Sequence, residues 1–197
     1  MSLKVILASQ SPRRVTLLKQ MGIDCEQMPA DIDETALANE MPADYVLRLA
    51  EQKALAVASK MYDSHLPILA ADTTVAIGYD ILGKPIDNND AYNTLKKLSG
   101  NTHTVHTAVA LIFNGARATV LNSTLVQMMP LSDAMIAAYI ASNEHSDKAG
   151  SYAIQGLAGC WVEKITGSYS GVMGLPVHET ALLLKKLKVF ANWDAKF

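Results

Sequence analysis

The chain has 197 residues, half of them hydrophobic, and a formal net charge of −2. This size and composition predict one domain, or two closely joined lobes, with ample apolar core, and the lack of a basic excess argues against binding to a nucleic-acid polymer. Cys25 and Cys160 fit neither a metal pair nor a disulfide framework, so we expect two reduced thiols. No apolar run reaches the roughly 20 residues that cross a membrane. We therefore expect a soluble, cytoplasmic protein that does not bind membranes.

Hydrophobic periodicity and turn residues predict helices that alternate with strands and hairpins. In chain order, the predicted elements are a strand at 4–8, a helix at 12–21, a helix at 41–60, a strand at 67–77, a short return strand within 78–85, a helix at 88–100, a hairpin of strands at 103–113 and 117–128, a helix at 132–142, a strand at 159–165 and a helix at 175–187.

Several boundaries have a specific local signal. Pro12 suits the first turn of a helix, where its missing N–H costs nothing, and Gly22 ends that helix. The Asn-Gly pair at 114–115 is the strongest short hairpin signal. Ser132 is placed to cap the helix that follows it.

Hairpins, rather than single strands, separate the helices, which favours a mixed α/β sheet over a doubly wound parallel sheet. The sequence contains neither G-x-G-x-x-G nor G-x-x-x-x-G-K-[ST], so it gives no support to a Rossmann or P-loop phosphate site. We see no linker or repeat, and we treat residues 1–197 as one domain.

Polar residues that interrupt an apolar pattern are candidates for a functional site. Lys53 shares a helical face with Val46 and Val57, and the alternative is a lysine that snorkels to solvent at the edge of that face. Asp72 interrupts a strand that is apolar on both sides, where a carboxylate needs a partner; the alternative is that neighbouring threonines satisfy it. The glycine-punctuated stretch 147–156, with Lys148, Ser151 and Gln155, is typical of a binding loop or of simple turns.

Cations and carboxylates also gather at the predicted element junctions. Ser9, Ser11, Arg13 and Arg14 surround the start of a helix, an arrangement that suits an oligophosphate. Carboxylates among phosphates suit a divalent cation. This chemistry would allow metal-assisted attack of water on phosphorus, with Asp72 accepting the proton. The residues by themselves do not reveal the base, the sugar or the bond that is cleaved.

Eight motifs, in order, resemble those of the Maf family of nucleoside triphosphate pyrophosphatases. The match runs from about Leu3 to about Leu187, nearly the whole chain. The motifs are ASQSPRR (8–14), DE (33–34), RLAEQKA (48–54), AADT (70–73), GKP (83–85), LSGNTHTVHTAVAL (98–111), DKAGSYAIQG (147–156) and GLP (174–176).

The resemblance implies an inosine-triphosphatase-like fold: an elongated mixed sheet with flanking helices and two lobes around a deep cleft. It implies hydrolysis of a nucleoside triphosphate between the α and β phosphates, with Mg²⁺ or Mn²⁺ as cofactor, metal ligands not identified, and a possible homodimer. By similarity, Asp72 is the proton acceptor. The residues implied to bind substrate in the cleft are Ser9, Arg13, Arg14, Glu34, Lys53, Thr73, Lys84 and Gln155.

Arg13, Thr73 and Gln155 follow the branch of this family that is similar to dTTP/UTP pyrophosphatases, so we expect dTTP, UTP or modified pyrimidine nucleotides as substrates. The 7-methyl-GTP branch instead shows Trp, Gln and Glu at these positions. A Gln amide both donates and accepts, which matches the O4 and N3–H edge of thymine or uracil. Two alternatives stay open: a 7-methyl-GTP pyrophosphatase, and a non-catalytic nucleotide-binding regulator of septum formation.

Overall fold

The computed structural model describes residues 3–61 and 65–189. Trp193 and Phe197, which match no motif in the sequence, lie outside the described residues. In chain order the elements are β1 (Leu3–Leu7), α1 (Pro12–Gln20), β2 (Ile23–Gln27), α2 (Pro42–Ala58), β3 (Ile68–Ile77), β4 (Asp80–Leu82), α3 (Asn88–Leu98), β5 (Thr102–Phe113), β6 (Ala116–Met128), α4 (Asp133–Ala141), two 3₁₀ turns (Ala149–Ser151 and Leu157–Trp161), β7 (Val162–Thr166), α5 (Tyr169–Met173) and α6 (Val177–Lys186).

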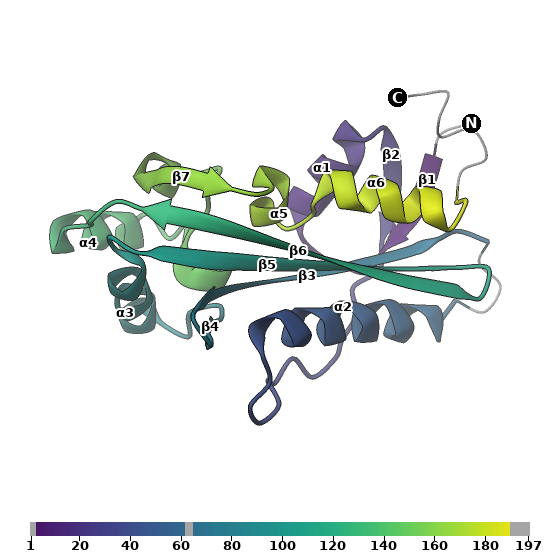
Figure 1. The fold of residues 1–197 in the computed structure, drawn as a ribbon, viewed down its shortest axis with the longest axis horizontal. Helices are drawn as coiled ribbons and strands as arrows, with labels where there is room; N and C mark the ends of the chain where they lie inside the picture. Colours follow the sequence, from purple (N-terminus) through teal and green to yellow (C-terminus); the bar gives the residue numbers. More distant parts are fainter. Residues whose placement is uncertain (1–2, 62–64, 190–197) are drawn as a thin grey trace.

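The strands form one mixed sheet in the order β2-β1-β3-β5-β6-β7, with β4 paired to β3. β1 runs parallel to β2 and β3, whereas the pairs β3–β5, β5–β6 and β6–β7 are antiparallel. The long strands β5 and β6 run the length of the molecule, with helices flanking them (Figure 1). The predicted elongated mixed sheet with flanking helices is therefore confirmed.

Two apolar clusters pack on opposite faces of the sheet at one end. Val46, Ala50, Ala54 and Val57 of α2 pack on one face of β1, β3 and β5. α1 and α6 cover the other face, through residues such as Leu18 and Leu184. The sequence predicts an apolar stripe of Val46, Leu49, Ala50 and Val57 on α2, and the prediction is confirmed, because all four residues are fully buried.

A third cluster forms the core of the other end of the molecule. It joins α3, α4, β4 and the far halves of β5 and β6 around Trp161, Tyr139 and Leu95. The chain therefore has two apolar clusters at one end of the sheet and one at the other, and the long strands β5 and β6 connect the two ends (Figure 1). This arrangement matches the two lobes that the family resemblance implies.

Some local predictions hold and others are wrong. Pro12 is the first residue of α1, the Ser132 side chain accepts from the Met135 N–H, and the Asn-Gly turn joins β5 to β6. β2 was not predicted, because only its first residue is buried and it shows no alternating pattern. The predicted strand at 159–165 is wrong at its start, since Leu157–Trp161 is a 3₁₀ turn, and the five-residue helix α5 is too short for a periodic signal.

Within residues 3–61 and 65–189, no helix is long and apolar enough to span a bilayer. Cys25 and Cys160 are both free thiols, as expected.

Candidate active site

A pocket of about 600 Å³ opens beside the middle of β3. β1 pairs with β3 only at Ile68 and Leu69, and β4 pairs only from Val75 onward, so in the described part of the chain no strand covers this edge of β3 between them. Both lobes contribute to the lining. The structure brings together in this pocket all nine residues predicted for the site, which are Ser9, Arg13, Arg14, Glu34, Lys53, Asp72, Thr73, Lys84 and Gln155.

Lys53 connects two of the carboxylates that line the pocket, Glu34 and Asp72. Its Nζ donates to Asp72 Oδ1 at 2.6 Å and lies 2.7 Å from Glu34 Oε1. The Lys53 and Asp72 side chains are 12% and 10% exposed, whereas Glu34 is 46% exposed. The snorkelling alternative is wrong, because the ammonium pairs inside the protein instead of reaching solvent. The partner of Asp72 is a lysine 19 residues away in sequence rather than a neighbouring threonine.

The charges around Glu34 determine its protonation. Burial acts to raise the pKa of Glu34, but the hydrogen bond from Lys53 and the charges of Lys53, Lys84 and Arg14 outweigh it, and its pKa lies below the ordinary value. Glu34 is therefore ionised at neutral pH. The pocket thus presents negative oxygens and positive side chains side by side.

Arg14 joins three segments at the base of the pocket. Its guanidinium donates to Gly174 O at 2.8 Å, Ser9 Oγ at 2.9 Å and Thr73 Oγ1 at 3.2 Å. Burial lowers the pKa of Arg14, and the Asp72 carboxylate opposes that effect. The sequence predicts that Arg14 faces phosphate. The structure shows that its Nε, Nη1 and Nη2 already donate to oxygens of three other segments of the protein.

Arg13 points to a different part of the pocket. Its Nη1 lies 3.8 Å from Asp147 Oδ2, and Asp147 also pairs with Lys148. The side chain of Arg13 is 25% exposed. Arg13, on α1, and Lys148, in the second lobe, therefore meet at Asp147, and both cations line the pocket.

Two loops of the second lobe meet at Gly150. Its N–H donates to Gly83 O at 3.1 Å, next to Lys84. Gln155 and Lys148 line the pocket, whereas Ser151 is fully buried. Gly150 thus fixes the relative position of the segments that carry Lys84 and Gln155.

We expect Gly150→Ala to destabilise the protein more than Gly22→Ala. Both glycines have a left-handed backbone, with φ of 69° and 68°, but a Cβ at Gly150 would lie 2.8 Å from Val75, while one at Gly22 meets nothing within 4 Å. Gly22→Ala should cost about 1 kcal/mol from backbone strain alone, and Gly150→Ala about 2–4 kcal/mol because overlap adds to it. Urea unfolding of both variants measures the difference, and equal losses would contradict the steric argument.

Glu34 and Asp72 are the residues that could hold a divalent metal. Lys53 contacts one oxygen of each carboxylate, so a cation would use the other oxygen. Among residues 3–61 and 65–189 no group of three His, Cys, Asp or Glu side chains is arranged around a metal position. Mg²⁺ typically takes one or two carboxylates and completes its shell with waters and substrate phosphates, which this donor pair fits.

Sequence reasoning missed several residues that shape the pocket. Tyr45 lines it from α2 and donates its hydroxyl to Glu34 O at 2.9 Å. Thr107 is fully buried, lies 3.0 Å from Thr73 Oγ1 and donates to Gly171 O at 2.8 Å. Tyr45 is eight residues before Lys53 on the same helix, a spacing that could have identified it. For Thr107 only the strand pairing gives a signal, because Thr73 is its direct partner across β3 and β5.

Comparison with known proteins gives consistent matches. The family model described as "Maf-like protein" matches residues 4–187, a range that includes all nine predicted site residues. A dTTP/UTP pyrophosphatase of Methylobacillus flagellatus is 47% identical over 186 residues, which is 94% of each chain. A dTTP/UTP pyrophosphatase of Shewanella oneidensis is 50% identical over 190 residues, 93% of this chain and 98% of that protein. Among solved structures, the Staphylococcus aureus Ham1 protein shares 11% identity at a TM-score of 0.48, covering 64% of this chain and 71% of that one.

Proposed function

This chain belongs to the Maf-like protein family, and on that premise we propose that it hydrolyses dTTP and UTP to the nucleoside monophosphate and pyrophosphate. Relatives at 47% and 50% identity over more than nine-tenths of the chain are named dTTP/UTP pyrophosphatases. The observation that carries the proposal is the Lys53 bridge between Asp72 and Glu34 in a pocket that also holds Arg13 and Lys84. A carboxylate base, phosphate-binding cations and two metal-binding oxygens are the groups that this reaction needs.

In the proposed reaction, Asp72 accepts a proton from water as the water oxygen bonds to the α-phosphorus. The bond from that phosphorus to the oxygen bridging to the β-phosphate breaks, and pyrophosphate leaves with the bond's electron pair. Lys53, Lys84 and Arg13 are proposed to stabilise the phosphate charge, which grows on the leaving group. Mg²⁺ or Mn²⁺ held by Glu34 and Asp72 would neutralise further charge on the phosphates.

Ser9 is proposed to contact the ligand from the loop after β1. Arg14, in turn, keeps that loop in place, since it donates to the Ser9 hydroxyl at 2.9 Å. Thr73 and Gln155 are proposed to recognise the base. The exposed amide of Gln155 offers both a donor and an acceptor to the O4 and N3–H edge of a pyrimidine.

Pyrophosphate release from a panel of canonical and modified nucleotides, assayed with Mg²⁺ and Mn²⁺, tests the activity. Release should be fastest from dTTP, UTP or a modified pyrimidine triphosphate. If no nucleotide releases pyrophosphate, the enzymatic proposal fails and the alternative of a nucleotide-binding regulator of septum formation takes its place. In that case, binding and any cellular effect should survive Asp72→Asn unchanged.

The double variant Thr73→Gln/Gln155→Glu should shift preference from dTTP towards 7-methyl-GTP. A carboxylate favours the cationic methylated guanine and cannot donate to O4 of a pyrimidine. We expect the ratio of kcat/KM for dTTP to that for 7-methyl-GTP to fall by about tenfold or more, since an unpaired polar group costs about 1–3 kcal/mol. An unchanged ratio would favour the alternative in which 7-methyl-GTP is already the substrate.

We also propose that the protein acts in the cytoplasm on a free nucleotide, without binding a nucleic-acid polymer or a membrane. The net charge of −2 supports the first of these exclusions. A homodimer is proposed from the family resemblance alone.

A further inference from the structure

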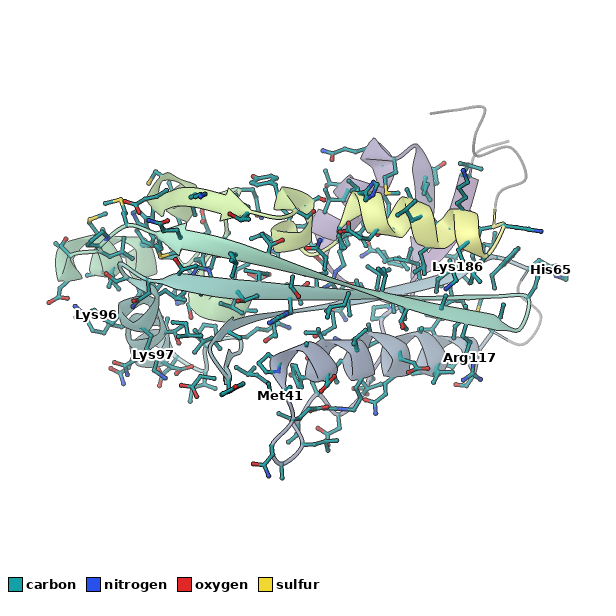
Figure 2. The ribbon with its side chains drawn as sticks, in the orientation of Figure 1. Met41, His65, Lys96, Lys97, Arg117 and Lys186 are labelled. Atoms are coloured by element: carbon teal, nitrogen blue, oxygen red, sulfur yellow. The ribbon has the colours of Figure 1, made fainter. Side chains whose placement is uncertain are left out.

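The segment that brings Glu34 to the pocket, residues 33–40, is here called the strap. It follows β2 and projects from the body of the molecule just before α2, close to Met41 (Figures 1 and 2). Residues 33–39 are all exposed, and a hollow of about 610 Å³ lies between the strap and α2, lined by Leu37 and Leu55 among others. Apolar packing therefore does little to hold the strap in place.

Arg48 of α2 holds the strap through charged hydrogen bonds. Its Nε donates to Glu40 Oε1 at 2.6 Å and its Nη2 to Glu40 Oε2 at 2.7 Å, a two-pronged contact of the kind that is strongest between Arg and a carboxylate. Nη2 also donates to Thr35 O at 3.1 Å. One side chain thus contacts the strap near both of its ends.

Within the strap, Glu40 closes a tight turn. Its Oε2 accepts from the Leu37 N–H at 3.0 Å, and its own N–H donates to Leu37 O at 3.1 Å. Asn39, in the turn, has a φ of 59°. Glu40 therefore binds both Arg48 and the backbone of the turn, so that Arg48 holds the turn through Glu40.

The face of α2 that carries Arg48 also contacts the strap at Glu34. Tyr45, Arg48 and Gln52 are spaced by three and four residues, so they share one side of the helix. Tyr45 donates to Glu34 O at 2.9 Å, and Gln52 Oε1 accepts from Arg48 Nη1 at 3.2 Å. Burial, with the nearby carboxylates of Asp72 and Glu34, raises the pKa of Tyr45 to about 12, so its hydroxyl stays a donor.

We propose that Arg48 is a positioning residue, whose two-pronged contact with Glu40 fixes the strap so that Glu34 meets Lys53 at the pocket. Seven of the eight residues of the strap are exposed, so without this contact the strap would sample many conformations, and Glu34 would occupy the productive one for only a fraction of the time. The inference rests on the proposed function, which assigns Glu34 to the metal and phosphate site.

Hydrogen exchange tests the structural half of this proposal without any assay of activity. In Arg48→Met, amides of residues 33–41 should exchange at least about tenfold faster than in the unaltered protein, because the hydrogen bonds from Arg48 to Glu40 and Thr35 are lost. Peptides from the rest of α2 should be unchanged. Lys4→Met, which breaks the exposed 3.2 Å pair with Glu26, is the matched control and should leave the strap unaffected. Strap exchange that stays as in the unaltered protein would overturn the proposal.

A double-mutant cycle with Glu34→Gln tests the functional half. Arg48→Met should lower kcat/KM by about 10- to 100-fold, as expected for a misplaced site residue, and should have no further effect in the Glu34→Gln background. Equal losses in both backgrounds would show that Arg48 does not act through Glu34 and would overturn the inference. Arg48→Lys, which keeps the charge but not the two-pronged contact, should show the same direction if Arg48→Met folds poorly.

The failure of the proposed function is distinguishable from the failure of this inference. If the unaltered protein releases no pyrophosphate from any nucleotide, the proposed function falls, and hydrogen exchange still decides whether Arg48 holds the strap. If pyrophosphate is released and the strap loosens in Arg48→Met without any change in kcat/KM, the positioning role is wrong.

Discussion

Asp72→Asn is expected to lower the rate of pyrophosphate release by about 10²–10⁴-fold, the usual contribution of a general base. Asn has the shape of Asp and its side-chain oxygen can still accept from Lys53, which now donates to Asp72 at 2.6 Å. It has no basic oxygen that could take a proton from water. Nucleotide binding should persist, because removing a negative charge from the pocket does not weaken the attraction of the cations for phosphate.

Steady-state assays for kcat and calorimetry for nucleotide affinity separate the two effects of Asp72→Asn. Asp133→Asn is the matched control, since Asp133 pairs with Lys96 at 2.9 Å on the surface and its side chain is 70% exposed. This control should keep full activity. A rate for Asp72→Asn within a few-fold of the unaltered protein would remove Asp72 from the mechanism.

Lys53→Met is expected to damage both activity and stability. It leaves the carboxylates of Asp72 and Glu34 facing each other without their common cation, and it removes a charge that the proposed reaction places at the phosphates. We expect kcat/KM to fall by about 10²–10³-fold, as for loss of one charged stabilising group. The free energy of unfolding should fall by about 2–4 kcal/mol, below the upper end for a broken buried pair because Glu34 is 46% exposed.

The double variant Lys53→Met/Asp72→Asn separates these two losses. It removes the unpaired buried charge, so it should recover much of the stability while remaining inactive. Lys96→Met is the matched control: Lys96 lies on α3 (Figure 2) and is not among the residues that line the pocket, and its ion pair with Asp133 is exposed, so the change should stay within about 1 kcal/mol. If Lys53→Met and Lys96→Met destabilise the protein equally in urea, the buried pair is not a significant source of stability.

Predictions with a local cause were the accurate ones. Pro12 begins a helix, Asn114-Gly115 makes a hairpin turn and Ser132 caps a helix. Each of these effects involves only residues that are about four or fewer positions apart in the sequence. β2 was missed because it lacks such a local cause: it is held by its pairing with β1, which is distant in sequence, and its own residues are mostly polar. The α2 stripe was correct because helical periodicity fixes which residues share a face.

The candidate site shows the same division. Periodicity placed Lys53 on the buried face of α2, and the apolar run around Asp72 placed that carboxylate in a buried strand. The nine site residues were named from their order in the chain, largely through the resemblance to a family, and the structure gathers them in one pocket. The roles of Tyr45, Thr107 and Arg48 were not predicted, since their partners lie on other segments.

The amino-acid order by itself determined the longer helices, the hairpin turn and which side chains break an apolar pattern, because these depend on spacings of two to four residues. The tertiary structure decided the partners. Lys53 pairs with Asp72 because α2 packs across β3, and Arg14 reaches Gly174, 160 residues further along the chain, because α1 and α5 lie on the same side of the sheet. Such contacts follow from strand register and from how helices pack on the sheet, and no short-range pattern encodes either of them.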